Sequence, residues 1–108
     1  MYIYINKYIY IYRCNRSAAL LNADKVMESL RDARTSKLLD SKYYKAAYRE
    51  GIALEKLSRF EEAAVAFCDA STIIQSTLAV DLTLLNKMKQ LMLENINKAK
   101  EQYKSIKK

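Results

Sequence analysis

The sequence predicts an all-α fold, and three observations lead to this prediction. The 108 residues contain no proline and a single glycine, Gly51, whereas a sheet protein of this length needs several turns built from those residues. The apolar fraction is 51%, which is ordinary for a folded domain. Apolar residues also recur at steps of three and four along most of the chain, which is the spacing of one helix face.

Residues 1–9 form a low-complexity segment in which Tyr and Ile alternate. Such alternation resembles a strand, but no second strand candidate follows with which it could pair. The segment is too short to span a membrane and lacks the features of a signal peptide. A TA dinucleotide repeat translates as Tyr-Ile-Tyr-Ile, so a translated repeat or a misplaced start would explain the segment. We expect no dedicated function from residues 1–8.

Residues 10–75 are expected to form two pairs of helices. Helical spacing of the apolar residues predicts them over residues 10–21, 25–38, 42–57 and 60–74. Asn22 or Asp24 can cap the second helix. The sequence Ser58-Arg59-Phe60-Glu61 has the pattern of a capping box and predicts the start of the fourth.

Residues 76–108 are expected to form a capping helix and a basic tail. Asp81 can cap this long helix, whose apolar positions form one continuous stripe: Leu82, Leu85, Met88, Met92, Ile96, Ala99, Tyr103 and Ile106. A stripe of this kind packs on one side only. The lysines near the C-terminus are interpreted as a solvated helix end that complements the helix dipole.

The chain repeats itself with a period of 34 residues. A shift of 34 aligns identical residues: Tyr10 with Tyr44, Ala19 with Ala53, Leu20 with Leu54 and Glu28 with Glu62. A period of this length that contains two helices is typical of tetratricopeptide repeats.

The second copy resembles the tetratricopeptide-repeat family, which has aromatic, small and aliphatic residues at the positions of Tyr48, Gly51, Leu54, Phe60, Ala63, Phe67 and Ala70. In the first copy, Ser17, Ser29 and Ala33 occupy the matching small or aromatic places. The resemblance implies helical hairpins of an α-solenoid over residues 10–75, a capping helix after them, and binding to other proteins. Two repeats are fewer than the three or so that a stable stack needs, so we expect a piece of a longer repeat protein or a truncated paralogue.

Within that family, the chain resembles the chaperone adaptors with a carboxylate clamp, at Asn15-Arg16-Ser17-Ala18-Ala19 and at Lys45-Ala46-Ala47-Tyr48-Arg49. The resemblance implies that Asn15, Lys45 and Arg49 bind the acidic C-terminal peptide of a heat-shock chaperone. The complete clamp also uses a lysine and an asparagine on an earlier helix. Asn6 and Lys7 have the wrong order and spacing for those roles, so a partial clamp is expected.

The spacing of these three residues suits the proposed chemistry. Lys45 and Arg49 are four residues apart and share a helix face, and Asn15 precedes Arg49 by one repeat period. Arg offers a fork to a carboxylate, Lys a point charge and Asn an amide donor. The alternative is a generic repeat scaffold that binds another peptide or docks within a larger array.

The composition bears on the remaining function classes. The net charge of +7 suits an acidic partner, but no nucleic-acid-binding motif accompanies it, so we expect neither nucleic-acid nor membrane binding. No histidine is present, which removes the commonest general base and metal ligand. We therefore expect no catalytic, metal or cofactor site. Cys14 and Cys68 are expected to be reduced, partly buried thiols of a cytoplasmic protein.

Overall fold

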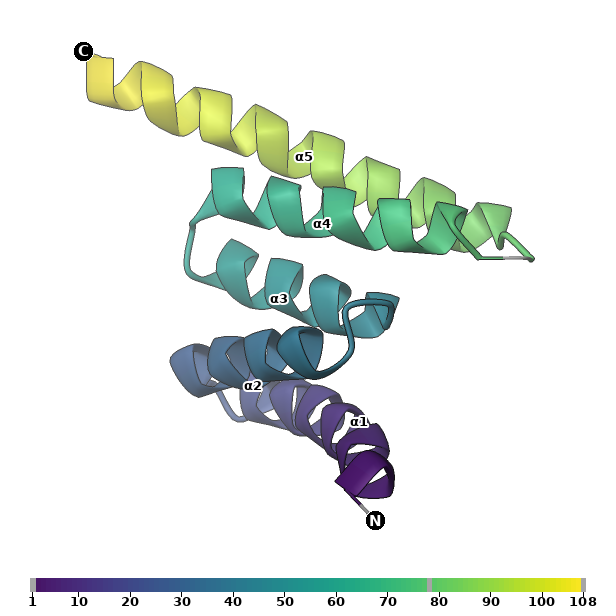
Figure 1. Cartoon of the computed structure of the whole chain (residues 1–108). Coiled ribbons are helices and arrows are strands. Elements are labelled where there is room, and N and C mark those ends of the chain that lie inside the picture. Colours follow the sequence, from purple (N-terminus) through teal and green to yellow (C-terminus); the bar gives the residue numbers. More distant parts are fainter. Residues whose placement is uncertain (1, 78, 108) are drawn as a thin grey trace.

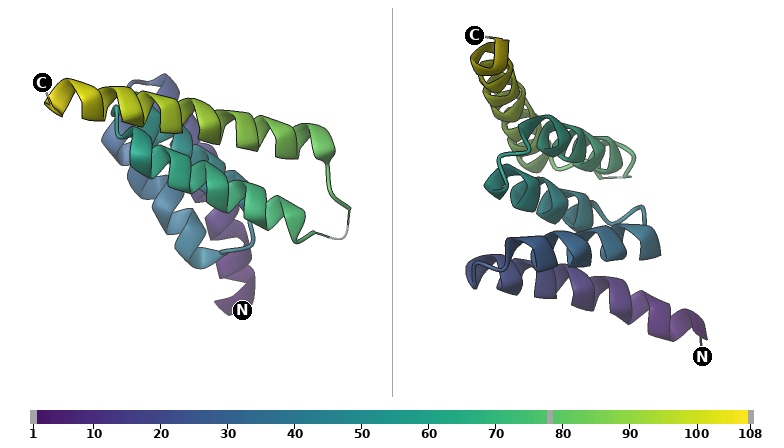
Figure 2. Two further views of the ribbon diagram at one scale, coloured as in Figure 1. Left: turned by 90° about the horizontal axis from the view of Figure 1, so that it is seen from above. Right: turned by 90° about the vertical axis from the view of Figure 1, so that its left-hand side faces the viewer.

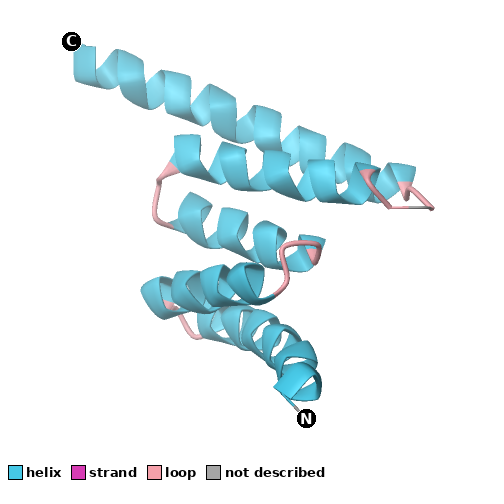
Figure 3. Ribbon diagram, in the orientation of Figure 1, coloured by secondary structure: helices cyan, strands magenta, loops and turns pink. Residues whose placement is uncertain are grey.

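Five helices follow one another in the part of the chain that the structure describes, and each runs antiparallel to the next (Figure 1). The computed structural model describes the backbone of residues 2–77 and 79–107 and the side chains of residues 8–77 and 79–106. The helices are α1 (Tyr2–Asn22), α2 (Val26–Leu39), α3 (Tyr44–Lys56), α4 (Phe60–Gln75) and α5 (Leu82–Lys107). Short loops join them, and no strand is present within the described residues (Figure 3). The predicted all-α fold is confirmed.

The helices stack in chain order, as Figure 2 shows from two further directions. Each helix contacts the next, and α1 also contacts α3. The core therefore runs as a continuous layer between successive helices. Its residues come mainly from α3 and α4, with Ala47, Leu54, Phe67, Ala70 and Ile74 among those buried. The repeated hairpins α1–α2 and α3–α4 are thus the fold that the resemblance implied.

The Tyr/Ile segment is helical rather than extended. α1 runs without a break from Tyr2 to Asn22, so it begins eight residues before the expected first residue, Tyr10. Tyr and Ile lose only a few tenths of a kcal/mol each in a helix relative to the best formers, whereas a strand without a partner leaves its backbone groups unpaired. The side chains of residues 2–7 lie outside the described part, so the expectation for the function of residues 1–8 is not addressed.

Gly51 allows the closest contact between two helices in the second hairpin. A Cβ atom built on Gly51 would lie 2.7 Å from Cε1 of Phe67, which is closer than carbon atoms can approach without displacement. Phe67 is fully buried, with 0% of its surface exposed, so a side chain at residue 51 would have to displace a ring of the core. α3 and α4 therefore approach closely at Gly51, which stands at a small position of the family pattern.

The first hairpin solves the same packing problem with hydroxyl groups. Ser17 and Ser29 occupy the places of Gly51 and Ala63 one period earlier, and both are buried. The Ser17 hydroxyl donates to the Ser29 carbonyl at 2.8 Å, and the Ser29 hydroxyl donates to the Ser17 carbonyl at 2.7 Å. These reciprocal bonds satisfy two polar groups that would otherwise be costly to bury. They also hold α1 and α2 together at short range.

The turn inside each hairpin contains a residue with a left-handed backbone conformation. The capping prediction at each of these two turns was wrong. Asp24 has φ 63° and Ser58 has φ 58°, so neither occupies the N-cap position. Lys25 and Arg59 are the N-cap residues, and neither makes a side-chain capping bond. Instead, the Arg59 amide donates to the Leu54 carbonyl at 2.9 Å, and the Ser58 amide donates to the Glu55 carbonyl at 3.0 Å. This pair of bonds is a Schellman motif, which ends the preceding helix.

The sequence pattern at these turns was ambiguous because Ser and Asp favour both helix starts and left-handed ends. Asn22 lies inside α1 and does not cap α2 either. The prediction for the last helix is confirmed, since the Leu84 amide donates to Asp81 Oδ1 at 3.1 Å.

Replacing Gly51 by Ala should destabilise the protein by about 1–3 kcal/mol, because the added methyl group collides with the buried Phe67 ring. In an unconstrained helix the same change is stabilising by about 1 kcal/mol, so the sign of the effect is diagnostic. Chemical denaturation measures it. In a Phe67→Leu background Gly51→Ala should be less costly, and equal costs in both backgrounds would contradict the contact.

Replacing Ser58 by Gly should stabilise the protein by about 0.5–1 kcal/mol, since Gly adopts a left-handed conformation without steric cost. Ser76→Gly is the matched control, because Ser76 caps α4 with φ −83° and gains nothing from the change. Thermal unfolding of both variants provides the comparison. If Ser58→Gly were no more stable than Ser76→Gly, the left-handed turn would be refuted.

Candidate functional site

The three predicted site residues lie on α1 and α3, the first helices of the two hairpins. Asn15 and Lys45 are exposed, and Arg49 is half-buried. Because α1 and α3 contact each other, the 34-residue register brings the turn of α1 that carries Asn15 alongside the N-terminal half of α3. Among the described residues no hydrogen bond joins the three side chains, so they are not tied to one another.

Cys14 indicates where the two cations lie. This thiol is buried in α1, next to Asn15 in sequence. Burial raises the pKa of Cys14, while the positive charge and hydrogen bonding of Arg49 and the charge of Lys45 act against this rise. Both cations of α3 therefore lie close to α1 at the turn that carries Asn15. Sequence register alone could not place them against this thiol.

Tyr48 gathers cations from two helices around one ring. The guanidinium carbon of Arg49 lies 5.3 Å from the Tyr48 ring centroid, and the Lys87 ammonium nitrogen of α5 lies 5.4 Å from it. Such distances allow cation–π attraction. The Tyr48 ring is half-buried and also packs against Phe67, with centroids 6.2 Å apart. We call Asn15, Lys45, Tyr48, Arg49 and Lys87 the cationic face.

Lys87 was not predicted from the sequence as a member of this site. It stands on the polar side of a long helix outside the 34-residue register, where lysines are commonplace. The only signal in the sequence was the order of the helices. α3 lies beside α1, two helices earlier in the chain, and by the same stacking α5 can lie beside α3. The acidic residue Asp81 lies near the same region. Burial is the main reason why the pKa of Tyr44 is raised, and the negative charge of Asp81 raises it further.

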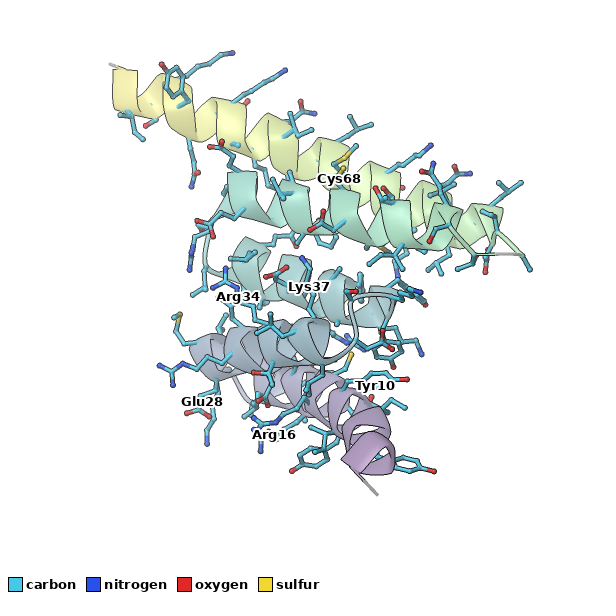
Figure 4. The ribbon with its side chains drawn as sticks, viewed as in Figure 1. Tyr10, Arg16, Glu28, Arg34, Lys37 and Cys68 are labelled. Atoms are coloured by element: carbon cyan, nitrogen blue, oxygen red, sulfur yellow. The ribbon has the colours of Figure 1, made fainter. Side chains whose placement is uncertain are left out.

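The interhelical ion pairs among the described residues lie outside the cationic face. The Arg34 guanidinium donates to Glu50 at 3.0 Å, and Lys37 donates to Glu50 at 3.2 Å and to Asp69 at 2.8 Å. Figure 4 labels Arg34 and Lys37, which come from α2. The network links α2 to α3 and α4.

A second set of ion pairs joins the first two helices. Arg13 and Arg16 of α1 both pair with the buried Asp32 of α2, and the hydrogen bonds from Arg16 are the main reason why the pKa of Asp32 is lowered. Figure 4 shows Arg16 at the contact between these helices.

The cationic face differs from these networks because its charges are not neutralised by close carboxylates. None of the ion pairs among the described residues involves Lys45, Arg49 or Lys87. Three positive charges from two helices thus remain available to an anion. Such a cluster attracts carboxylates and can offer them charge-assisted hydrogen bonds.

Other kinds of site find less support. No helix among the described residues has the length and apolar character needed to cross a membrane. The same residues hold no group of three or more potential ligands arranged to bind a metal ion. Both thiols are free; Cys14 is buried, whereas Cys68 is exposed. The expectation that Cys68 is partly buried was wrong, because it faces outward between α4 and α5.

The chain is similar to tetratricopeptide repeat protein 28 of Mus musculus, with 38% identity over 68 residues, and to the protein of the same name of Homo sapiens, with the same identity and length. The match covers 63% of this chain, and the chain spans 3% of the length of these relatives. No family model matches the chain. The similarity supports a relationship to tetratricopeptide-repeat proteins and a role as a protein–protein interaction module. It does not extend to the adaptors with a carboxylate clamp.

The placement of the two cations can be tested through the Cys14 thiol. In a Cys68→Ser background, Lys45→Gln or Arg49→Gln should raise the pKa of Cys14 further, because each removes a charge that stabilises the thiolate. The Cβ chemical shift of Cys14, which reports ionisation of the buried thiol without a reagent, should then titrate only at higher pH. Arg31→Gln on α2 is the control. An unchanged titration in both α3 variants would show that these cations do not lie close to Cys14.

Proposed function

We propose that the cationic face binds the acidic C-terminal peptide of a partner protein, in the manner of a partial carboxylate clamp. The observation that carries the proposal is the placement of three cations that have no ion-pair partner among the described residues. Lys45 and Arg49 lie close to the turn of α1 that carries Asn15, and Lys87 shares the Tyr48 ring with Arg49. The resemblance of the two clamp motifs identifies heat-shock chaperone tails as the class of peptide to test first.

Each residue has a distinct part in the proposed complex. Arg49 presents a planar fork that matches a carboxylate, and Lys45 supplies a point charge one helical turn away. Asn15 donates its amide from the neighbouring helix. Tyr48 restricts the Arg49 guanidinium by holding it over a fixed ring, which reduces the side-chain entropy lost on binding. Lys87 extends the positive charge towards the side chains of a longer acidic peptide.

The second candidate function is that of a generic repeat scaffold. The observation that favours it is that the chain spans 3% of the length of its relatives, so one or two repeats of such proteins can act mainly as neighbours of other repeats. In that case the exposed cations are a solvated surface, and binding to a free carboxylate would be weak. The two functions differ in their dependence on a terminal carboxylate.

The deciding experiment is a calorimetric titration of a Met-Glu-Glu-Val-Asp peptide, with a free C-terminus or a C-terminal amide. The free acid should bind, and the amide should bind at least about tenfold more weakly because one charged hydrogen-bond set is lost. Equal affinity of the two peptides would favour the scaffold function.

Lys45→Glu and Arg49→Glu should each weaken binding of the free acid by about ten- to a hundredfold, the effect of losing a charge-assisted hydrogen bond of about 1.5–3 kcal/mol. Lys87→Glu should act more weakly and in a salt-dependent way. Arg31→Glu is the control, since it makes the same charge change on the exposed side of α2. A loss of affinity with Arg31→Glu equal to that with Arg49→Glu would show that net charge, not the cationic face, governs binding.

A further inference from the structure

An apolar groove lies between α4 and the second half of α5, away from the cationic face. Its volume is about 610 Å³. The α4 wall is formed by Ala64, Val65 and Cys68, and the α5 wall by Met92, Ile96 and Ala99. Figure 1 shows the C-terminal half of α5 rising away from α4 and extending past its end. Figure 4 labels Cys68 at this junction.

The groove exists because α5 is held to the body of the protein on its other side. There, Asn95 donates to Glu55 at 2.8 Å, and Gln102 donates to the Ser58 carbonyl at 2.8 Å. Along the stripe of α5, Leu85 and Met88 are buried. Met92, Ile96 and Ala99 are only half-buried where they line the groove, and Val65 on the opposite wall is 58% exposed.

The shape and spacing of the walls fit a helix. Apolar residues recur at steps of three or four along both α4 and α5, so the walls present ridges and hollows with the spacing that a third helix can fill. A helix with apolar residues at i, i+3, i+4 and i+7 is the usual occupant of a groove of this kind. An extended peptide would instead require open backbone groups, which two helical walls do not offer.

The charges around the groove select the occupant. Lys100 and Lys104 line it from α5, one helical turn apart, while Glu61 lines it from α4. The excess is positive, and the whole chain carries +7. A second copy of this chain would bring like charges together, whereas an acidic helix is attracted both at a distance and at the α5 wall.

We propose that this groove is a second protein-binding site, which takes an acidic amphipathic helix of a partner protein. The apolar face of that helix lies against Val65 and Ile96, and its carboxylates lie toward Lys100 and Lys104. This site is separate from the cationic face and does not depend on the peptide bound there.

The test uses a designed amphipathic peptide with leucines at helical spacing and glutamates along the flanks, together with a twin that carries lysines in place of the glutamates. Fluorescence anisotropy with the full chain should show the acidic peptide binding about tenfold or more tightly than its basic twin, as expected for complementary charge. Bound acidic peptide should also slow alkylation of the exposed Cys68, which lines the groove. Equal binding of the twins, or no protection of Cys68, would overturn the proposal.

Matched variants locate the binding site. Val65→Glu should weaken binding of the acidic peptide by about tenfold or more, whereas Leu93→Glu should not, because Leu93 is similarly exposed, at 56%, but stands outside the groove on α5. Lys100→Glu with Lys104→Glu should reverse the preference between the twins. Equal losses in Val65→Glu and Leu93→Glu would overturn the proposal.

Two further measurements distinguish the groove from the cationic face and from a dimer interface. Arg49→Glu should leave binding of the amphipathic peptide unchanged, and a loss as large as that of Val65→Glu would assign the peptide to the cationic face. Sedimentation of the free chain should show a monomer at the concentrations used. A dimer that Val65→Glu dissociates would show that the groove takes a second copy, and would overturn the proposal.

Discussion

The close approach of the two helices within each hairpin is the constraint on which the other features depend. In the second hairpin a missing side chain at Gly51 admits the ring of Phe67, and in the first hairpin Ser17 and Ser29 bond to each other's backbone. The two solutions stand one repeat period apart and serve the same geometry. Because both hairpins close in this way, α1 and α3 meet in register and bring Asn15 to the side of α3 that carries Lys45 and Arg49.

The distribution of ion pairs follows from this stacking. Acidic residues that face another helix, such as Asp32 and Glu50, are buried and paired with basic residues of the adjacent helix. These pairs neutralise the basic residues that point between helices. The basic residues of the cationic face have no such neighbour among the described residues, so its positive charge is directed outward. The fold thereby separates charges that stabilise the stack from charges that are available to a partner.

Much of the fold could be predicted from the sequence because its signals are local or periodic. Helical spacing placed α2 to α4 within about two residues of their bounds, and the family resemblance assigned Gly51 and Phe67 to small and aromatic positions of the repeat. The extension of α1 could not be predicted, since Tyr and Ile are enriched in strands and their alternation has the period of a strand rather than of a helix. The roles of Asp24 and Ser58 were missed because a residue type does not reveal the sign of φ.

The candidate site, like the fold, could be predicted from the sequence only in part. Asn15, Lys45 and Arg49 could be selected because a 34-residue register and a four-residue step relate them. Lys87 could not, because its place beside Tyr48 depends on how a helix outside the register crosses the stack. The groove beside Val65 was missed for a similar reason: the stripe on α5 predicts packing on one side, but the crossing of α5 over α4 leaves Met92, Ile96 and Ala99 only half-buried.

The most direct test of the central claim, that the cationic face binds an acidic C-terminal peptide, is to map that peptide by amide chemical-shift perturbation on the labelled full chain. We expect the shifts to concentrate on the turns of Asn15, Lys45, Arg49 and Lys87 and to shrink when the terminal carboxylate is replaced by an amide. Shifts confined to α2 and to the groove between α4 and α5, or shifts that are the same for acid and amide, would contradict it.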